Sequence, residues 1–392
     1  MLPTPVFSTV RNWLLKLGLF NLEKKCEEGK WIWIIDSSIQ MGAMKCLFII
    51  GVRLEKLLKK TNFVLSHEDV EPLVLKTIES CPGEVVKEAL NEAKKKTHGA
   101  ISIVSDEGSE LKRGVRLFQE EQPLCQKPIH LHDITHKVDL VLKRKFKKDC
   151  KWKKFTREMT KTIQQLKLST SSHLAPPKQR QKSRMRSEID SIEWGIKICK
   201  YLASDMANEF EKSKLSWVLS YRKQLNTYME ISVFFDITTK EVREHGYSQE
   251  TIKILKRKGA GVPSSKRSRE FFLEILNVVE EEAKKVPEGS RLLGCTEVLE
   301  SVFGSFKQME KNHASSGLTS LVLSLPAILG SLTEEVIKDA MEKISVEDLQ
   351  EWISKNLGTT FCSLQRDSLG KQKREINKDY LDSHELKEGV VG

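Results

Sequence analysis

Short apolar runs mark strands in the first third of the chain. Residues 31–35, 46–52 and 100–104 are almost wholly apolar and rich in β-branched and aromatic side chains, a pattern typical of buried strands. The pattern also favours a strand near 62–65 and another at 129–134. The segments 31–35, 46–52 and 62–65 lie close together in sequence, which predicts an antiparallel meander.

Between and after these runs, apolar residues recur at helical spacing. Residues 83–95 show this pattern, a second helix is predicted to begin at Ser109, and a third covers 137–146. The predicted order is three strands, helix, strand, helix, strand, helix. This is the order of a ribonuclease-H-like fold, an α/β class in which helices flank a mixed five-stranded sheet.

The chain becomes basic after the third predicted helix and loses its strand pattern. Residues 169–187 form a low-complexity loop rich in Ser, Pro, Lys and Arg. Helical periodicity returns at 188–233 and again at 269–285. We therefore expect a mostly α-helical insertion over 147–290 that interrupts the α/β domain.

Two more helices are predicted beyond the insertion. Residues 296–310 have helical periodicity, and Ser331 to Glu334 has the capping-box pattern that opens a helix. The expected division of the chain is an N-terminal helical segment (1–28), the first part of the α/β core (29–146), the insertion (147–290), the second part of the core (291–360) and a polar tail (361–392).

The positive charge is concentrated in one segment. The net charge is +11, and residues 137–187 hold 17 Lys and Arg against 3 Asp and Glu, so the rest of the chain is slightly acidic. A solvated helix face explains such a run as well as a binding surface does. A polyanion is the natural partner, because each neutralised phosphate releases condensed counterions.

Cysteine usage and hydropathy favour a cytosolic protein. The eight cysteines include no C-x-x-C pair, which is typical of reduced thiols. Lys16 interrupts the apolar residues near the N-terminus, so we expect no signal peptide. The apolar stretch 318–329 is too short to span a bilayer, and we expect no membrane partner.

Three acidic residues far apart in sequence are candidate metal ligands. Asp36 and Asp106 each follow a predicted strand, and Glu300 lies on a predicted helix. Lys307 is seven residues beyond Glu300, so the two share a helix face. Three such acids could hold two Mg²⁺ ions ~3.5–4 Å apart, with Lys307 placed to bind a phosphate. The alternative is that these acids are ordinary turn and cap residues.

Several stretches together resemble the motif blocks of insertion-sequence transposases of the DDE type. They are WIWIIDSSIQMGAMKCLFIIGVRL (31–54), ISIVSDEGSELKRGVRLF (101–118), HDITHKVDLVLKRKFKKDCKWKKF (132–155), LAPPKQRQKSRMR (174–186) and CTEVLESVFGSFKQMEK (295–311). The resemblance implies that Asp36, Asp106 and Glu300 are the catalytic acids and metal ligands. Glu297, one turn before Glu300, is the fallback for the third acid.

The same resemblance implies an activity and its partners. It implies a transposase that cleaves DNA and transfers strands with Mg²⁺ or Mn²⁺, in two metal positions, acting on transposon ends and target DNA as a homodimer or higher oligomer. It implies a nucleoid-associated protein of a prokaryotic cytoplasm. Two alternatives stay open at this point: a DNA-binding transposase remnant that mobilises nothing, and a structure-specific nuclease on the same scaffold.

The sequence departs from the family pattern in two places. Ser37 and Ser38 follow Asp36 where related sequences are expected to have His-Thr. Residues 5–22 resemble the last helix of a helix-turn-helix module, so 1–28 is interpreted as a remnant of a DNA-binding module that would read terminal repeats.

Basic residues and one tryptophan are candidate DNA contacts, with packing as the competing interpretation. Trp152 could stack on an unpaired base, although the spacing of its apolar neighbours favours a buried helix face. The candidates are Lys307, Lys112, Arg113, Trp152, Lys153, Lys154, Lys178, Arg180, Lys182, Arg184 and Arg186.

A histidine-rich cluster around residue 133 has two interpretations. His132 and His136 would share a helical face and could bind zinc, but no further pair completes a tetrahedral set. We expect instead that Asp133 and His136 cap and orient the helix that follows the fifth strand. Asp133 is also a secondary candidate near the metal site.

Overall fold

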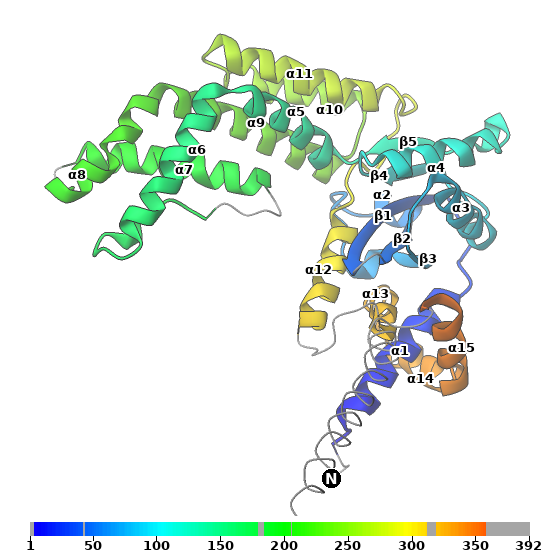
Figure 1. Cartoon of the computed structure of the whole chain (residues 1–392). Helices are drawn as coiled ribbons and strands as arrows, with labels where there is room; N and C mark the ends of the chain where they lie inside the picture. The colour runs from blue at the N-terminus through cyan, green and yellow to red at the C-terminus, as the bar shows by residue number, and fades with distance from the viewer. Residues whose placement is uncertain (1–3, 42–43, 179–183, 205, 312–318, 358–392) are drawn as a thin grey trace, which may run out of the picture. The chain divides into compact units, whose positions relative to one another are not determined.

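The computed structural model describes residues 4–41, 44–178, 184–204, 206–311 and 319–357. The chain divides by its internal contacts into two compact units (Figure 1). Unit 1 comprises residues 1–61, 65–130 and 296–392, and unit 2 comprises 62–64 and 131–295.

Unit 1 contains the sheet and the helices that cover it. In chain order its elements are α1 (Phe7–Glu23), β1 (Trp31–Met41), β2 (Met44–Arg53), α2 (Leu54–Leu58), η1 (His67–Asp69), β3 (Glu71–Ile78), α3 (Gly83–Thr97), β4 (Ser102–Ser105), α4 (Ser109–Glu120), η2 (Leu124–Gln126), β5 (Ile129–His132), α12 (Glu297–Lys311), η5 (Ser320–Leu323), α13 (Ser324–Ala327), α14 (Glu334–Lys343) and α15 (Val346–Leu357). The last two residues of β5 already belong to unit 2.

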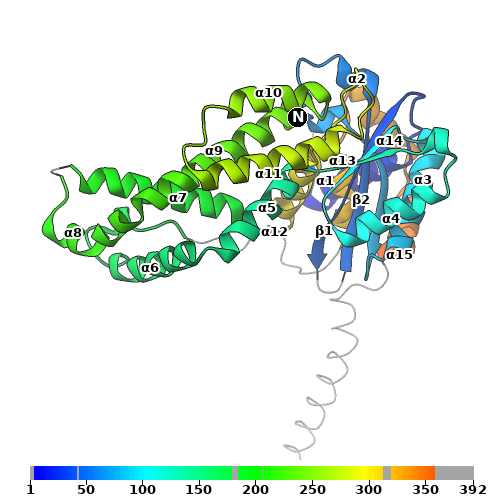
Figure 2. The same ribbon diagram turned by 90° about the horizontal axis from the view of Figure 1, so that it is seen from above.

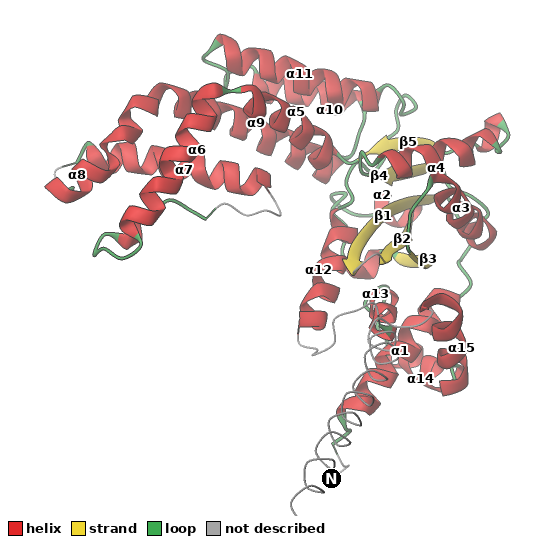
Figure 3. Ribbon diagram, in the orientation of Figure 1, coloured by secondary structure: helices red, strands yellow, loops and turns green. Residues whose placement is uncertain are grey.

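The five strands form one mixed sheet in the order β3-β2-β1-β4-β5 (Figure 3). Strands β1, β2 and β3 are antiparallel neighbours, and β4 runs parallel to β1. A meander of three strands followed by strands on the other side of β1, with flanking helices, is the ribonuclease-H-like arrangement. The predicted fold class is therefore confirmed.

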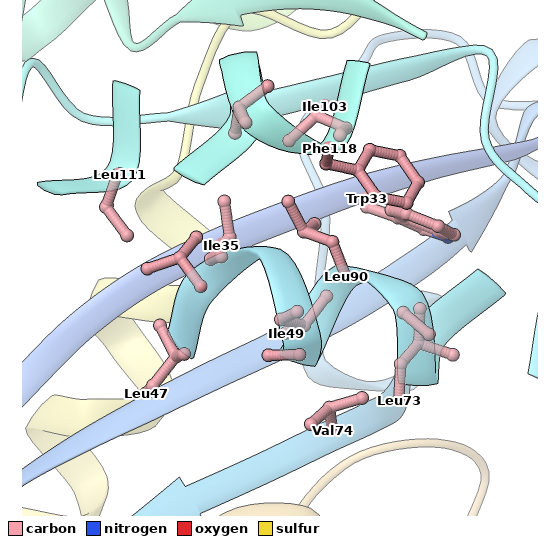
Figure 4. Packing of buried hydrophobic residues seen from close by; sticks show 14 of the residues in the cluster. Trp33, Ile35, Leu47, Ile49, Leu73, Val74, Leu90, Ile103, Leu111 and Phe118 are labelled. Carbon is pink, nitrogen blue, oxygen red and sulfur yellow. The ribbon is translucent and has the colours of Figure 1, made fainter. Parts of the chain in front are cut away.

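Both faces of the central strand are covered, which explains its unbroken apolar run. Residues 31–35 are at most 1% exposed. On one face Trp33 and Ile35 pack with Leu90 of α3 and Phe118 of α4 (Figure 4). Because strand side chains alternate between faces, Ile32 and Ile34 point to the opposite face. A strand buried on both sides loses the polar alternation of a surface strand.

Helix α12 packs on that second face. The ring of Phe303 lies 6.4 Å from the ring of Phe48 in β2. Phe48 follows Leu47 and precedes Ile49, both of which point into the first face, so it must point to the second. The helix that carries Glu300 is thereby held against β1 and β2.

Helix α1 is an integral part of unit 1. Leu17 packs with Ala327 and Ala340 from α13 and α14. A Cβ atom on Gly18 would lie 1.9 Å from the carbonyl oxygen of Leu323, so only glycine allows this approach. The Asn21 amide donates to the backbone of the same region. The segment expected as a separate remnant, 1–28, thus buries its apolar face inside unit 1.

The predicted third strand was misplaced. The strand β3 covers Glu71–Ile78, whereas 62–65 is a loop whose Phe63 amide donates to Glu244 within unit 2. The strand was missed because Pro72 lies in it, at the point where the pairing register with β2 shifts. A proline usually argues against a strand, and edge strands are where it is tolerated.

Apart from the end of β5, the described elements of unit 2 are helices, and one isolated β-bridge pairs Tyr247 with Leu292. Its elements are α5 (Ile134–Lys148), α6 (Cys150–Leu166), η3 (Ser172–Leu174), α7 (Arg184–Leu202), α8 (Glu209–Leu215), η4 (Ser216–Tyr221), α9 (Arg222–His245), α10 (Gln249–Gly259) and α11 (Lys266–Ala283) (Figure 2). The long helix α9 packs against α5, α7, α10 and α11. Because α5 packs on α9 and α11, unit 2 begins at residue 131 rather than at 147, and it ends at 295.

Two local predictions at helix ends differ from the structure. Helix α14 forms where the capping pattern predicts a helix, but its N-cap is Thr333, which accepts from the Val336 amide, and not Ser331. His132 ends strand β5, so it does not share a helical face with His136.

Among the described residues, no helix is both long and apolar enough to cross a membrane.

Candidate functional site

Asp36 and Asp106 are brought to neighbouring positions by the pairing of two parallel strands. The register pairs Ile32 with Ser102 and continues to Ile35 with Ser105. Asp36 and Asp106 are the next residues on the two chains, and both are half-buried. The strand predicted to end before Asp36 continues to Met41, so Asp36 lies within β1, whereas Asp106 directly follows β4. Adjacent strands lie ~4.8 Å apart, so the backbones of the two residues are close together. The carboxyl ends of parallel strands commonly present ligand groups.

The turn after β4 fixes the Asp106 side chain. Its Oδ1 accepts a hydrogen bond from the Gly108 amide at 2.7 Å. A Cβ atom on Gly108 would lie only 2.8 Å from that oxygen, so glycine leaves room for the turn. The Ser105 hydroxyl bonds to Nε2 of His130 at 2.8 Å and ties β4 to β5. One oxygen of the Asp106 carboxylate is thus held by a backbone amide directly after the end of β4.

Asp36 faces the side of the sheet on which α12 lies. It pairs directly with Phe48 across β1 and β2, and directly paired residues share a face. Phe48 packs on Phe303 of α12. Asp36 and the glutamate helix therefore lie on the same face of the sheet.

Glu300 and Lys307 occupy one flank of α12. At ~100° per residue, both fall beside Phe303 and away from Ser301. The buried side of the helix consists of Val298, Leu299, Val302, Phe303 and Phe306. Glu300 is exposed and Lys307 is half-buried. The predicted shared face of Glu300 and Lys307 agrees with this helix, and exposed Glu297 lies one turn earlier.

His67 holds the opposite flank of α12, and sequence reasoning missed it. Its Nε2 lies 3.1 Å from the Ser301 hydroxyl, and its carbonyl accepts from the Gly330 amide at 2.9 Å. Asp69 caps the same turn through Ser66 and pairs with Lys60. Because His67 leads into the edge strand β3, the flank that carries Glu300 faces away from that edge. A lone histidine in a polar loop gives no sequence signal for this contact.

Asp36 and α12 lie on the same face of the sheet, but the three acids do not form a closed ligand set. Within the ranges that the structure describes, no three His, Cys, Asp or Glu side chains are arranged to hold a metal ion. The donor types fit a hard ion, since Mg²⁺ takes oxygen ligands, few of them from protein, and keeps positions for water and phosphate. Asp36 within β1 and Asp106 directly after β4 supply two carboxylates of the kind that such an ion uses.

Buried groups around the site have shifted pKa values. Burial raises the pKa of the Cys46 thiol, and the nearby Asp36 carboxylate raises it further. Burial also raises the pKa of Glu310, against the opposing charge of Lys307. Cys46 is therefore an inert apolar neighbour of Asp36, and Lys307 has an acidic neighbour on its own helix.

Two of the candidate DNA contacts beside the site are in ion pairs. Lys112 pairs with Glu107, and Arg113 pairs with Glu84 at 2.6 Å. Both pairs are partly exposed and therefore contribute little to stability. A phosphate would have to compete with these carboxylates for either cation.

Trp152 is a core residue, which corrects its inclusion among the DNA contacts. It is 5% exposed, and its ring lies 4.7 Å from that of Phe146, 5.6 Å from that of Phe155 and 5.2 Å from that of Tyr228. Enclosed by three aromatic rings, it has no face open to a base. The packing interpretation of its sequence context is the one that the structure bears out.

The remaining basic candidates differ in how far they are described. Lys153, Lys154 and Lys178 are exposed. Arg184 and Arg186 belong to the first turn of α7, but their side chains lie outside the described part, as do Arg180 and Lys182 altogether. Their assignment as phosphate contacts stays a prediction.

Asp133 and His136 have the capping role that the sequence predicts. Asp133 is buried and is the N-cap of α5, where its Oδ1 accepts from the His136 amide at 2.8 Å and lies 3.1 Å from Nδ1 of the same residue. His132 bonds instead to Glu282. The alternative of a zinc site gains no support, because the described residues contain no group that could hold a metal.

Comparison with known proteins gives little guidance. No protein-family model matches the chain, and no curated protein matches it. Among solved structures, it is similar to the Drosophila P element transposase strand transfer complex, at 13% sequence identity and a TM-score of 0.39, over 85% of this chain and 87% of the other. We draw no functional conclusion from a likeness at this level. Any conclusion about function therefore depends on the residues of the site itself.

Proposed function

We propose that unit 1 is the catalytic core of a metal-dependent DNA transposase of the DDE type. The observation that carries the proposal is the register of β1 and β4, whose last pair, Ile35 with Ser105, directly precedes Asp36 and Asp106. Helix α12 supports it, because the helix packs on the face of Asp36 and carries Glu300 on one flank.

Each residue has a proposed role in the chemistry. Asp36 and Asp106 supply carboxylate oxygens from two rigid strands, and Glu300 supplies a third carboxylate from α12. Lys307, on the same flank as Glu300, binds a phosphate of the DNA. These three acids would hold Mg²⁺ or Mn²⁺ in two positions, which would supply Lewis-acid stabilisation to the attacking hydroxyl and the leaving oxygen. The reaction is cleavage at a transposon end followed by joining of the freed 3′-hydroxyl to target DNA.

The proposed partners follow from that reaction. The substrates are double-stranded DNA ends and a target duplex. Two ends must be joined to one target, so we propose that the protein acts as a homodimer or higher oligomer on DNA. The ordered sheet beneath Asp36 and Asp106 holds two of the proposed ligands in place before the substrate arrives.

The test is a nicking and joining assay with purified protein, Mg²⁺ and a duplex taken from the DNA that flanks its gene. We expect Asp36→Asn, Asp106→Asn and Glu300→Gln each to lower activity about a hundredfold or more, because metal ions contribute several kcal/mol to such reactions. Glu297→Gln and Glu107→Gln are the matched controls, one a turn from Glu300 and the other adjacent to Asp106, and should retain activity.

Each other outcome has a definite meaning. Full activity in any of the three acid variants removes that residue from the proposed site. Cleavage without joining identifies a structure-specific nuclease on the same scaffold. Binding without cleavage, with all three acids intact, identifies a DNA-binding protein that mobilises nothing.

A further inference from the structure

A cluster of exposed cations surrounds the junction of α5 and α6 in unit 2. Its members, here called the junction surface, are Lys147, Lys148, Lys151, Lys153, Lys154 and Arg157, all of them exposed. They come from the last turn of α5 and the first two turns of α6. The sequence places most of the surplus positive charge in this part of the chain, but it does not say which cations are available.

The junction surface differs from the other basic residues nearby in having no ion pairs. Lys143 pairs with Asp139 one turn away, and Lys145 pairs with Glu274 at 2.9 Å. Lys161 pairs with Glu158 at 2.8 Å. Over the described residues, no carboxylate lies in an ion pair with any of the six cations of the junction surface. Their charge is therefore not neutralised within the chain.

The acid in the middle of the cluster is withdrawn from the surface. Asp149 is buried and caps α6, accepting from the Lys151 amide at 2.8 Å. Its other oxygen accepts from the Tyr228 hydroxyl and pairs with Arg267 at 2.6 Å. Burial alone would raise the pKa of Asp149, but the bonds from Tyr228 and Arg267 hold it below its ordinary value. Asp149 thus anchors the junction without offering a charge to solvent.

The cations of α6 are held on a fixed outward face. The opposite side of the helix is buried through Trp152, Phe155 and Met159. At ~100° per residue, Lys153, Lys154 and Arg157 point away from that side. Lys153 and Arg157 are one turn apart, ~6 Å along the axis. A rigid helix presents this charge without the loss of backbone entropy that ordering a loop would require.

The chemistry of the surface selects the kind of partner. A membrane-binding helix needs several large apolar side chains beside its cations, whereas α6 exposes none, α5 exposes Leu140 alone, and exposed Leu168 lies beyond the end of α6. A duplex nucleic acid needs only cations, since it carries one charge per ~1.7 Å of its axis. No exposed aromatic ring accompanies the cations on α6, which disfavours stacking on single strands.

We propose that the junction surface binds the phosphate backbone of double-stranded DNA without reading its sequence. The choice of DNA among polyanions rests on the proposed function, whereas the surface itself rests on the geometry of unit 2. It would act as an anchoring site separate from the carboxylates of unit 1, holding DNA by charge alone.

The test measures binding of the full chain to a labelled duplex of arbitrary sequence by fluorescence anisotropy, in EDTA so that no metal-dependent step occurs. The variants are K147Q/K148Q/K151Q and K153Q/K154Q/R157Q. The matched control is K143Q/K145Q/K161Q, which removes as many charges from the same two helices but from residues that are in ion pairs. Circular dichroism checks that each variant keeps its helices.

We expect each junction variant to bind about tenfold more weakly at moderate salt, and its log–log salt slope to fall by ~0.9 for each phosphate that the variant no longer neutralises. The control should have nearly the same affinity and the same salt slope as the wild type. Equal weakening in the control and the junction variants, or unchanged binding in both junction variants, overturns the proposal. Equal affinity for anionic vesicles and for DNA overturns the assignment of the partner.

The failure of this inference is distinguishable from the failure of the proposed function. Asp36→Asn should bind the duplex as the wild type does, because its substitution leaves unit 2 unchanged. A chain that binds through the junction surface but never cleaves keeps the inference and loses the proposed function. A chain that cleaves DNA in Mg²⁺ but binds the duplex with unchanged affinity in both junction variants does the reverse.

Discussion

The two units place their acidic residues differently. In unit 2, Glu282 is 1% exposed, and it accepts from the His132 ring and the ammonium groups of Lys137 and Lys285. In unit 1, Asp36 within β1 and Asp106 directly after β4 are half-buried, and Glu300 is exposed on a helix. A buried acid enclosed by two ammonium groups and a histidine ring has no room for a ligand. A partly exposed acid does.

This contrast shows why a shifted pKa is a poor guide to the site in this protein. Burial alone would raise the pKa of Glu282, but bonds from His132, Lys137 and Lys285 hold it far below its ordinary value. Strongly shifted groups often mark active sites, although structural ion pairs shift a pKa as well. Glu282 is of the second kind, since Lys137 lies at the start of α5 and Lys285 just beyond the end of α11, and the carboxylate ties these segments together.

Removing the Glu282 carboxylate should have the largest effect on stability. Glu282→Gln leaves a buried amide beside two lysine ammonium groups and the His132 ring, and breaking such a pair costs about 3 kcal/mol. Glu280→Gln on the same helix removes a more exposed carboxylate whose pair with Lys284 contributes under about 1 kcal/mol. Hydrogen exchange along α11, together with urea unfolding, measures both. Equal destabilisation of the two variants would mean that the Glu282 cluster does not stabilise unit 2.

The same variant gives a pH signature with a definite sign. A carboxyl group with a lower pKa in the folded state stabilises the fold above its unfolded pKa of about 4.5, and that contribution disappears as the pH falls. The wild type should therefore lose stability below about pH 5 more steeply than Glu282→Gln does. Parallel pH profiles for the two proteins would contradict the assignment.

A smaller effect is expected where helices of unit 1 approach one another. Gly18→Ala places a methyl group 1.9 Å from the Leu323 carbonyl, so α1 must shift from α13, at a cost of about 1–3 kcal/mol. Gly304→Ala on α12 is the matched control, because its added Cβ meets no atom within 4 Å. It should stabilise the helix by about 0.5–1 kcal/mol. Thermal unfolding measures both, and a neutral Gly18→Ala would show that α1 packs loosely.

Local pattern was enough to predict much of unit 1. The apolar run 31–35 predicted β1, and helical spacing predicted α3 and the start of α4 at Ser109. The placement of Asp106 after a strand followed from the same runs, but β1 continues past Asp36 to Met41 because its pairing with β2 extends beyond the apolar run. The features predicted correctly depend on a few neighbouring residues, so a local signal is sufficient.

Features set by distant contacts could not be predicted. The boundary of unit 2 moved to residue 131 because α5 packs on α9 and α11, whose positions no local pattern reveals. The sheet face that α12 covers depends on Phe303 meeting Phe48, far away in sequence. The sequence pattern did not predict β3 because the strand contains Pro72, which has no backbone N–H to donate to a neighbouring strand. Whether a cation near residue 150 is in an ion pair depends on whether the fold brings a carboxylate close to it.

The smallest expected effect concerns the contact that holds α12 from the side opposite Glu300. His67→Ala and Ser301→Ala each remove one partner of the 3.1 Å bond, and a double-mutant cycle should give a coupling of about 1 kcal/mol. His67→Gln keeps a polar group at that position and should recover part of this coupling free energy. If the bond also positions Glu300, His67→Ala will raise the Mg²⁺ concentration needed for half-maximal nicking, whereas a merely stabilising bond will leave it unchanged. A coupling of zero would mean that α12 is held by Phe303 and its apolar neighbours alone.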